Sequence, residues 1–275
     1  MKLKKGITAI IPILNEEVRI FKTLNCFRWC EQIIVLDKGS EDDSVIIASK
    51  FENVKIIKKN FRNSKNSFLD EMSFLINHIE TEWYIPITAS DLITKKLALK
   101  IKSIISSKSQ NYNSISLPYK PYFMGINKNF SPWYYNRRTY IIKTETIVLN
   151  NSVHAVVSMS VKPIELKLKM ESNYDAVYHL THENYEGVLD RYHRYLREEK
   201  NDDISLSNQL KYIAKQIIKL VFFKRVLFRG KAAVALTFSF LSYHMLKYVV
   251  LWDSRYGNGI NTYAKIREKI SNEWN

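Results

Sequence analysis

Polar residues follow three apolar stretches of the chain, at the point where each stretch ends. They are Asn15 with Glu16, Asp37 with Gly39 and Ser40, and Thr88 to Asp91. In a parallel α/β sheet, ligands bind outside the carboxyl ends of the strands, where the connecting loops diverge. If the three stretches are strands of one such sheet, these residues lie along one edge and form a binding site.

The segments around these residues alternate between strand and helix patterns. Strands are expected at 7–14, 32–37, 53–59 and 83–87, and helices at 16–25, from Ser40 onward, at 67–79 and at 95–106. Ser40 can cap its helix, and the acidic residues 41–43 oppose the helix dipole. Near-continuous apolar strands separated by helices indicate a mostly parallel sheet covered on both faces. The predicted fold class is therefore α/β.

The second half of the chain has a different pattern. Shorter strands are expected at 114–119, 139–143, 154–161 and 176–182, and helix dominates from Asn184 onward. We therefore expect a first domain over residues 1–200 and a helical, membrane-associating region over residues 201–275.

The composition favours a polyanionic partner. The chain has 275 residues, a formal net charge of +15 and a pI near 9.6, which suits nucleic acid, anionic lipid or a phosphate-rich substrate. Cys26 and Cys30 lack partners at metal-ligand spacing and are read as thiols of a reducing compartment. The apolar run near the N-terminus is short, contains Pro12 and lacks a cleavage site, so we expect a buried strand and a cytoplasmic protein rather than a signal peptide.

Much of the positive charge lies near the C-terminus. Residues 204–252 contain no Asp or Glu and eight Lys or Arg, among them Lys211, Lys215 and Lys219, which form one stripe on a helix. The segment 231–252 is apolar, but it has fewer than about 18 uninterrupted apolar residues, short of the usual criterion for a membrane span. An interfacial or packed hairpin on an anionic membrane is favoured over a packed helical core and over a span.

Two blocks in the first half carry a family resemblance. ITAIIPILNEE (7–17) followed by IIVLDKGSEDDS (33–44) resembles the opening of the family 2 glycosyltransferases. That family has an apolar strand before Pro-x-x-Asn-Glu and a second before Asp-x-Gly-Ser-x-Asp. Later stretches resemble the branch of lipopolysaccharide core β-glucosyltransferases, at 120–126, 133–143, 150–157 and 177–199.

The resemblance implies a GT-A fold, a nucleotide-binding α/β domain, and inverting transfer of a sugar from a nucleoside diphosphate, with a UDP-sugar favoured. It assigns Pro12, Asn15 and Glu16 to the walls of the nucleotide pocket. Asp37 would accept a hydrogen bond from the base or ribose, and Gly39 would let the backbone turn closely. Ser40 and Ser90 are also expected to contact the nucleotide-sugar donor.

The metal site of the family is altered in this chain. Family members end the fourth strand in Asp-x-Asp, which holds Mg²⁺ or Mn²⁺ against the diphosphate. Here Thr88-Ala89-Ser90 stands at that place, and Asp91 follows it.

Three interpretations of this altered metal site are open. Asp91 holds the cation with His179 or His182, or Arg137 and Arg138 neutralise the diphosphate without metal, or Asp91 caps the next helix in a degenerate site. His179 is the expected second metal ligand or a phosphate contact, against a packed or surface histidine.

The catalytic base is also altered. An inverting transfer needs a group that takes the proton from the acceptor hydroxyl. Members of the branch place His-Glu where this chain has His154-Ala155. His154 is one expected base, since histidine titrates near neutral pH, although a lone histidine on a strand is more often structural. Asp91 or a carboxylate elsewhere is the alternative.

The sequence thus predicts a bacterial enzyme that glycosylates a lipid-linked, lipopolysaccharide or other cell-envelope acceptor. It would be peripheral on the cytoplasmic face of the membrane. The alternative is a catalytically degenerate relative that serves as a binding or scaffold protein there. A nucleic-acid partner is not expected, because the positive charge lies beside the most apolar helix and no nucleic-acid-binding motif is present.

Overall fold

The computed structural model describes residues 3–59, 74–107, 111–149, 157–159, 162, 164–169, 172, 174–199 and 204–274. The chain forms two compact units. The first contains Met1–Asn127 and Trp133–Thr181, and the second contains Lys128–Pro132 and His182–Asn275. A domain boundary at residue 200 stays a prediction.

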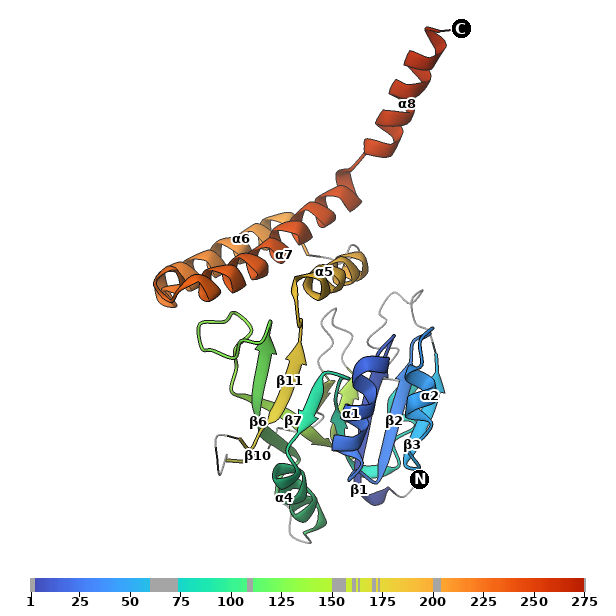
Figure 1. Ribbon diagram of the computed structural model, residues 1–275, viewed down its shortest axis with the longest axis vertical. Helices are drawn as coiled ribbons and strands as arrows, with labels where there is room; N and C mark the ends of the chain where they lie inside the picture. The colour runs from blue at the N-terminus through green and yellow to red at the C-terminus, as the bar shows by residue number, and fades with distance from the viewer. Residues whose placement is uncertain are drawn as a thin grey trace. The chain divides into compact units, whose positions relative to one another are not determined.

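The first unit is built on one large sheet (Figure 1). Its strands are β1 (Lys4–Ile13), β2 (Gln32–Asp37), β3 (Val54–Lys58), β4 (Thr81–Pro86), β5 (Asp91–Ile93), β6 (Ser114–Phe123), β7 (Arg137–Lys143), β10 (Glu165–Lys167) and β11 (Val177–Thr181). The order along the sheet is β3-β2-β1-β4-β7-β6-β11-β5, with β10 beside β6. Strands β1 to β4 run parallel, so their carboxyl ends meet at one edge. Strands β8 (Ile147–Leu149) and β9 (Val157–Met159) form a separate antiparallel pair.

Alternation of side chains along the strands produces a core on each face of the sheet. Ile7, Ala9, Ile11 and Ile13 of β1 pack with the apolar side of α1 (Glu17–Phe27) on one face. On the other face, Ile10 packs with residues of β2 and with Leu75 and Ile79. A strand buried on both faces must be apolar throughout, which explains the continuous hydrophobic run of β1. The predicted α/β fold with a mostly parallel sheet is confirmed.

Local signals placed one of the helix starts correctly and one incorrectly. Helix α4 (Lys95–Ser106) begins where expected, because the Thr94 side chain accepts a hydrogen bond from the Leu97 N–H. Helix α2 (Ser44–Ala48) begins after Asp43, so the prediction of a helix start at Ser40 was wrong. Ser40 instead belongs to the loop after β2, where its hydroxyl has a different partner, described below.

The second unit is helical. It contains α5 (Tyr185–Glu199), α6 (Leu206–Ile218), the short helical turns η2 (Lys219–Phe223) and η3 (Val226–Phe228), α7 (Lys231–Tyr256) and α8 (Gly259–Asn272). Helices α6 and α7 lie side by side (Figure 1), and Leu220, Val226, Ala233 and Leu241 form an apolar cluster where they join. Residues 231–252 thus belong to one continuous helix, and the hairpin is made by α6 and α7 together. The predicted helical C-terminal extension is confirmed.

Helix α7 has an unusual surface for a packed helix. By length and composition it is the one described helix that could cross a membrane, and 22% of its most apolar 18-residue window is buried. The hydroxyl of Tyr192 on α5 hydrogen-bonds the backbone carbonyl of Ser239, at 2.9 Å. Lys247 is buried and lies 3.0 Å from Glu199, so that lysine is paired rather than free. The remaining cations of the 204–252 segment lie on α6 and around the turn that follows it.

Candidate functional site

The loops after β1 and β2 are joined by hydrogen bonds between the predicted site residues. The Ser40 N–H donates to Asp37 Oδ1 at 2.9 Å, and the Asn15 N–H donates to Ser40 Oγ at 3.0 Å. The Asn15 side chain in turn accepts from the Glu41 N–H at 2.9 Å. Asp37, Ser40 and Asn15 therefore lie together at the carboxyl edge of the sheet, as expected.

Two of these residues have left-handed backbone conformations that allow the loops to turn sharply. Gly39 has φ 99°, which strains any residue with a Cβ. Asn15 has φ 55°, a conformation that asparagine tolerates better than most residues. Pro12 lies inside β1, where it is the register partner of Leu36 of β2, so it shapes the end of the strand rather than the loop.

The loop after β4 is tied to the same edge through Arg19 of α1, a residue that the sequence reasoning missed. Arg19 donates to Ser90 Oγ at 3.0 Å and forms an ion pair with Glu16. The Thr23 hydroxyl donates to the Ala89 carbonyl at 2.8 Å, which adds a second contact between α1 and this loop. The i, i+3 spacing of Glu16 and Arg19 on a helix was the available signal.

Asp91 is fully buried and is held from both sides. Its Oδ2 accepts hydrogen bonds from the Thr88 N–H at 2.8 Å and from the Thr88 hydroxyl at 3.1 Å. Its Oδ1 lies 2.8 Å from His179 Nδ1 and 3.4 Å from the Tyr119 hydroxyl. Burial pushes the pKa of Asp91 up, but its hydrogen bonds and the attraction of His179 when that ring is protonated outweigh burial, so the pKa lies below its ordinary value. Asp91 is therefore a carboxylate at neutral pH.

Asp91 does not cap α4, so that interpretation of the residue was wrong. Thr94 provides the cap, and Asp91 begins β5, which pairs with β11. The carboxylate instead orients an imidazole. A hydrogen bond from Nδ1–H to Asp91 selects the His179 tautomer whose Nε2 carries a lone pair. Among the residues that the structure describes, none hydrogen-bonds this Nε2, so it can accept a proton or bind a ligand.

Aromatic rings surround the pair. The Tyr119 ring stacks on Tyr135, with centroids 4.9 Å apart, and lies 5.8 Å from the His179 ring. Burial, and then the charge of Asp91, raise the pKa of the Tyr119 hydroxyl, so it stays protonated. The Arg138 guanidinium lies over the rings of Tyr119 and Tyr140, at 5.8 and 5.0 Å from their centroids. A positive charge thus lies against the two tyrosine rings.

The two predicted arginines have different surroundings. Arg137 donates to the Ser116 carbonyl at 3.0 Å and to the Leu168 carbonyl at 2.8 Å, so it ties β7 to its neighbours. Arg138 points to the other side of β7 and is exposed. Of the two, Arg138 is the one positioned to meet an anionic ligand.

The pair of Asp91 and His179 does not fit a divalent cation as arranged. Both Asp91 oxygens already accept hydrogen bonds, and the carboxylate has no exposed surface. Across the described ranges, no group of three or more His, Cys, Asp or Glu side chains could hold a metal. A hard cation needs several oxygen ligands, and one imidazole nitrogen is not enough. The metal requirement stays a prediction.

Two further predicted residues cannot be placed in this site. His154 lies outside the described residues, and its role as a base stays a prediction. His182 belongs to the second unit, where its ring lies edge-on to Tyr192, with centroids 6.5 Å apart. Cys26 and Cys30 are free thiols, as expected.

No protein-family model matches the chain. Among the curated relatives, an uncharacterized glycosyltransferase of Rickettsia bellii is 25% identical over 210 residues, which cover 73% of this chain and 68% of that protein. An uncharacterized glycosyltransferase of Rickettsia felis is 24% identical over 214 residues, covering 74% and 72%.

Solved structures give weaker matches. A crystal structure of S. aureus TarS, residues 1–349, matches 92% of each chain at 14% identity with a TM-score of 0.40. Glucosyl-3-phosphoglycerate synthase from Mycobacterium tuberculosis, in complex with Mn²⁺, UDP and glucosyl-3-phosphoglycerate, matches 52% of this chain and 58% of that chain, at 14% identity and a TM-score of 0.34. At such scores neither structure defines the ligands of this chain.

Proposed function

We propose that this chain, which belongs to the family 2 glycosyltransferases, moves a sugar from a nucleoside diphosphate to an acceptor hydroxyl with inversion at the anomeric carbon. The observation that carries this function is the convergence of the loops after β1, β2 and β4. Hydrogen bonds link Asp37 to Asn15 through Ser40, and an arginine links Glu16 to Ser90. The GT-A type of α/β fold places such loops at the carboxyl edge of parallel strands, where nucleotides bind.

The donor would be held at its nucleoside and at its diphosphate. Asp37, at the end of β2, would accept a hydrogen bond from the base or ribose, and uracil is favoured because its ring N–H suits a carboxylate. Gly39 would allow the backbone to approach the nucleotide. Arg138 would neutralise the diphosphate, since it is exposed and lies over the ring of Tyr119. Guanidinium groups suit phosphate oxygens because their donors form a planar fork.

The acceptor hydroxyl must lose a proton as it attacks. In this step the acceptor oxygen bonds to the anomeric carbon, the bond from that carbon to the diphosphate breaks, and the nucleoside diphosphate leaves with the electron pair. His179, oriented by Asp91, would accept the proton at Nε2. His154 remains a second candidate for that role.

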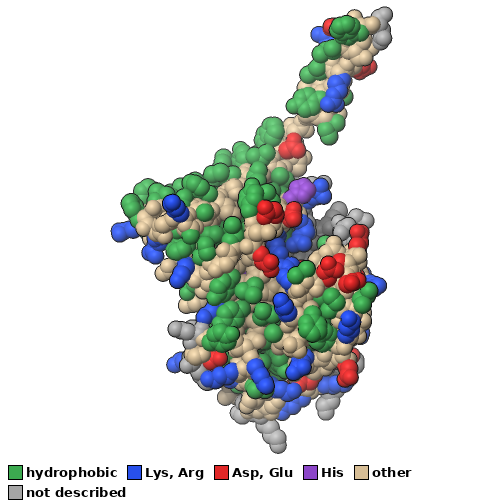
Figure 2. Space-filling model, viewed as in Figure 1, with side chains coloured by type: hydrophobic (Ala, Val, Ile, Leu, Met, Phe, Trp, Pro, Cys, Tyr) green, Lys and Arg blue, Asp and Glu red, His purple; other side chains and the backbone are tan. Residues whose placement is uncertain are grey.

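We place the reaction at the cytoplasmic face of the membrane, with a lipid-linked, lipopolysaccharide or other surface-glycan acceptor. The support is the second unit, which has no acidic residue over 204–252. In Figure 2, hydrophobic side chains cover much of the visible surface of α6 and α7, and Lys and Arg side chains stand at the end where the two helices join. Each Lys or Arg near an anionic surface contributes about 1 kcal/mol, so several give reversible peripheral attachment.

The test is detection of sugar transfer by mass spectrometry. Purified protein is incubated with bacterial membrane lipid extract and a panel of nucleotide sugars, with Mn²⁺, Mg²⁺ or a chelator. We expect one donor to yield a glycosylated lipid with the wild type and much less with Asp91→Ala. Absence of transfer from every donor would overturn the proposed activity, and equal turnover by both proteins would remove Asp91 from the mechanism.

A catalytically degenerate binding or scaffold protein is the second candidate. Two substitutions favour it, Thr88-Ala89-Ser90 in place of Asp-x-Asp and Ala155 in place of a glutamate. This candidate predicts that the protein binds nucleotide sugars in calorimetry and turns over none of them under any metal condition.

A further inference from the structure

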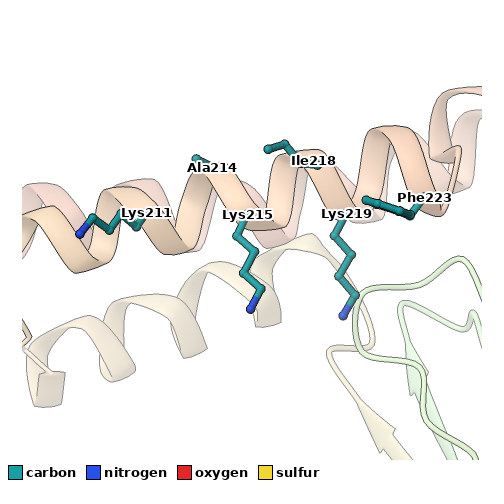
Figure 3. A pocket seen from close by; sticks show the side chains of 6 residues that line it. All are labelled: Lys211, Ala214, Lys215, Ile218, Lys219 and Phe223. Atoms are coloured by element: carbon teal, nitrogen blue, oxygen red, sulfur yellow. The ribbon is translucent and has the colours of Figure 1, made fainter.

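One side of α6 is exposed and carries a shallow hollow open to solvent, called the cavity below. The cavity has a volume of about 510 Å³ and is lined by Lys211, Ala214, Lys215, Ile218, Lys219 and Phe223 (Figure 3). The first five of these residues stand at positions i, i+3, i+4, i+7 and i+8, so they share one side of the helix. All six side chains are exposed.

The opposite side of α6 is the one that packs within the second unit. Gln209 and Ile213 are buried there, and Gln209 Nε2 donates to the His244 carbonyl of α7 at 2.9 Å. Leu220 of η2, after the end of α6, is buried in the apolar cluster with Ala233 and Leu241 of α7. These contacts fix the orientation of α6 and leave the cavity side without an internal role.

Uncompensated positive charge borders the cavity. Within the described part of the chain, Lys211, Lys215 and Lys219 form no ion pair, and no acidic residue occurs over 204–252. Figure 3 shows the side chains of Lys215 and Lys219 projecting side by side in one direction. Just beyond them, burial lowers the pKa of Lys224, and the nearby charges of Lys219 and Arg229 lower it further. The ammonium groups are therefore suited to an anion.

The same cavity has an apolar part that a free anion would leave in water. Ile218 is 50% exposed and Phe223 is 80% exposed. In the adjoining turn, Phe222 and Phe228 are 69% and 87% exposed. Exposed apolar side chains grouped in this way mark an interaction site, and here they lie next to unpaired lysines. A ligand that fits both parts has a phosphate joined to a hydrocarbon chain.

We propose that the cavity on α6 binds the phosphate group of a membrane lipid. Lys215 and Lys219 contact the phosphate oxygens, and Ile218 and Phe223 contact the first carbons of the lipid chain. This lipid contact rests on the membrane-face location in the proposed function and gives that location a defined site. A nucleic acid would match the lysines but not the aliphatic and phenyl groups, and inorganic phosphate would match the lysines alone.

Vesicle flotation with matched variants tests the site. The wild type, Lys215→Gln/Lys219→Gln and Arg225→Gln/Lys231→Gln are mixed with phosphatidylcholine vesicles with and without phosphatidic acid. The second pair is the control, because it removes two exposed cations from the neighbouring turn and from the start of α7. We expect the partition coefficient for phosphatidic acid vesicles to fall about 30-fold in the cavity variant. The control is expected to lose about threefold or less.

A second pair of variants tests the apolar part. Ile218→Ser/Phe223→Ser keeps every charge, and we expect it to weaken binding to phosphatidic acid vesicles while binding to neutral vesicles stays low. Equal losses in the cavity variant and the control would overturn the site in favour of diffuse charge attraction. Strong wild-type binding to neutral vesicles would overturn it in favour of apolar insertion alone. Displacement by millimolar inorganic phosphate, or tighter binding to duplex DNA, would also overturn it.

The same variants separate this site from the proposed function. UDP binding is measured by calorimetry on the wild type and on the cavity variant, and we expect equal affinities. Intact UDP binding with no lipid effect would remove the lipid site and leave the glycosyltransferase function standing. If the wild type does not bind UDP, that result would count against the proposed donor and leave the vesicle result unaffected.

Discussion

Asp91 and His179 lie directly opposite each other across the antiparallel strands β5 and β11, and Asp91 Oδ1 is 2.8 Å from His179 Nδ1. The carboxylate is fully buried, whereas the imidazole is 20% exposed. The backbone N–H of Leu180 also donates to the Ser90 carbonyl at 2.8 Å, so β11 is joined to the loop after β4 at two consecutive residues. The pair is thus built into the sheet next to the predicted donor loops.

The first prediction concerns this pair. Asp91→Asn keeps the size of the side chain but removes the charge that orients the imidazole, so we expect kcat to fall about 100-fold or more. His179→Gln removes the ring and is expected to cause a similar loss. The measurement is the turnover of the active donor by each single variant and by the double variant.

The double variant shows whether the two residues act together. If Asp91 works through His179, the double variant is no slower than His179→Gln, because residues that act as a unit are not additive. If the fold loss of kcat in the double variant equalled the product of the two single losses, the two residues would act independently, which would contradict that coupling. Thermal unfolding followed by circular dichroism checks that each variant is still folded, since removing a buried charge partner also costs stability.

The second prediction concerns recognition of the nucleotide by Asp37. Asp37→Asn replaces an acceptor for the base N–H with a group that can present a donor instead. A hydrogen bond to a charged group contributes about 1.5–3 kcal/mol, so we expect UDP affinity in calorimetry to fall about 10- to 100-fold.

Glu52→Gln is the matched control, because Glu52 is an exposed carboxylate just before β3, away from the loops after β1, β2 and β4. Its UDP affinity should equal that of the wild type. An unchanged affinity in Asp37→Asn would show that the base or ribose is held elsewhere.

Local patterns in the sequence were enough to find the strands and their ends. Apolar runs bounded by polar residues predicted β1, β2 and β4, and the helix pattern over 95–106 predicted α4. These signals are short-range, because strand burial and helix capping depend on neighbours along the chain. The same locality explains why Asn15, Asp37 and Ser90 were correctly expected at one edge.

Local sequence patterns did not predict the contacts that assemble the site. Arg19 reaches Ser90 across 71 residues, and His179 reaches Asp91 across 88. Strand β5 has three residues, too few for a period-2 pattern, so its pairing with β11 had no local signal. Asp91 was therefore read from the family pattern as a metal ligand or from local propensity as a cap, while its partners came from distant strands.

The third prediction concerns metal removal. Because both Asp91 oxygens accept hydrogen bonds, we expect sugar transfer to persist in the presence of a chelator. The positive charge that neutralises the diphosphate should come from Arg138 instead. Arg138→Gln is therefore expected to lower kcat/KM about 10-fold or more. The measurement is initial rate with EDTA, Mg²⁺ or Mn²⁺ for both proteins.

Arg138→Lys is the informative companion, because it keeps the charge and loses the planar fork. Partial activity in Arg138→Lys, with the chelator still tolerated, fits neutralisation by the side chain. Complete loss of wild-type activity in EDTA, with recovery on Mn²⁺ alone, would show that the site holds a cation.

The last prediction concerns the acid stability of the second unit. Burial and, to a smaller extent, the charge of Lys247 lower the pKa of His244 to about 4, below its ordinary value near 6.5. The unfolded chain therefore binds a proton on this residue at a higher pH than the folded chain does. The stability present above about pH 6.5 is lost progressively as the pH falls toward 4.

His244→Gln removes that proton uptake, so its melting temperature, followed by circular dichroism, should fall less than that of the wild type between pH 7.5 and about 5. His193→Gln, on the exposed side of α5, is the control and should follow the wild type. Parallel curves for His244→Gln and the wild type would mean that the imidazole is hydrated enough to titrate normally in the folded chain.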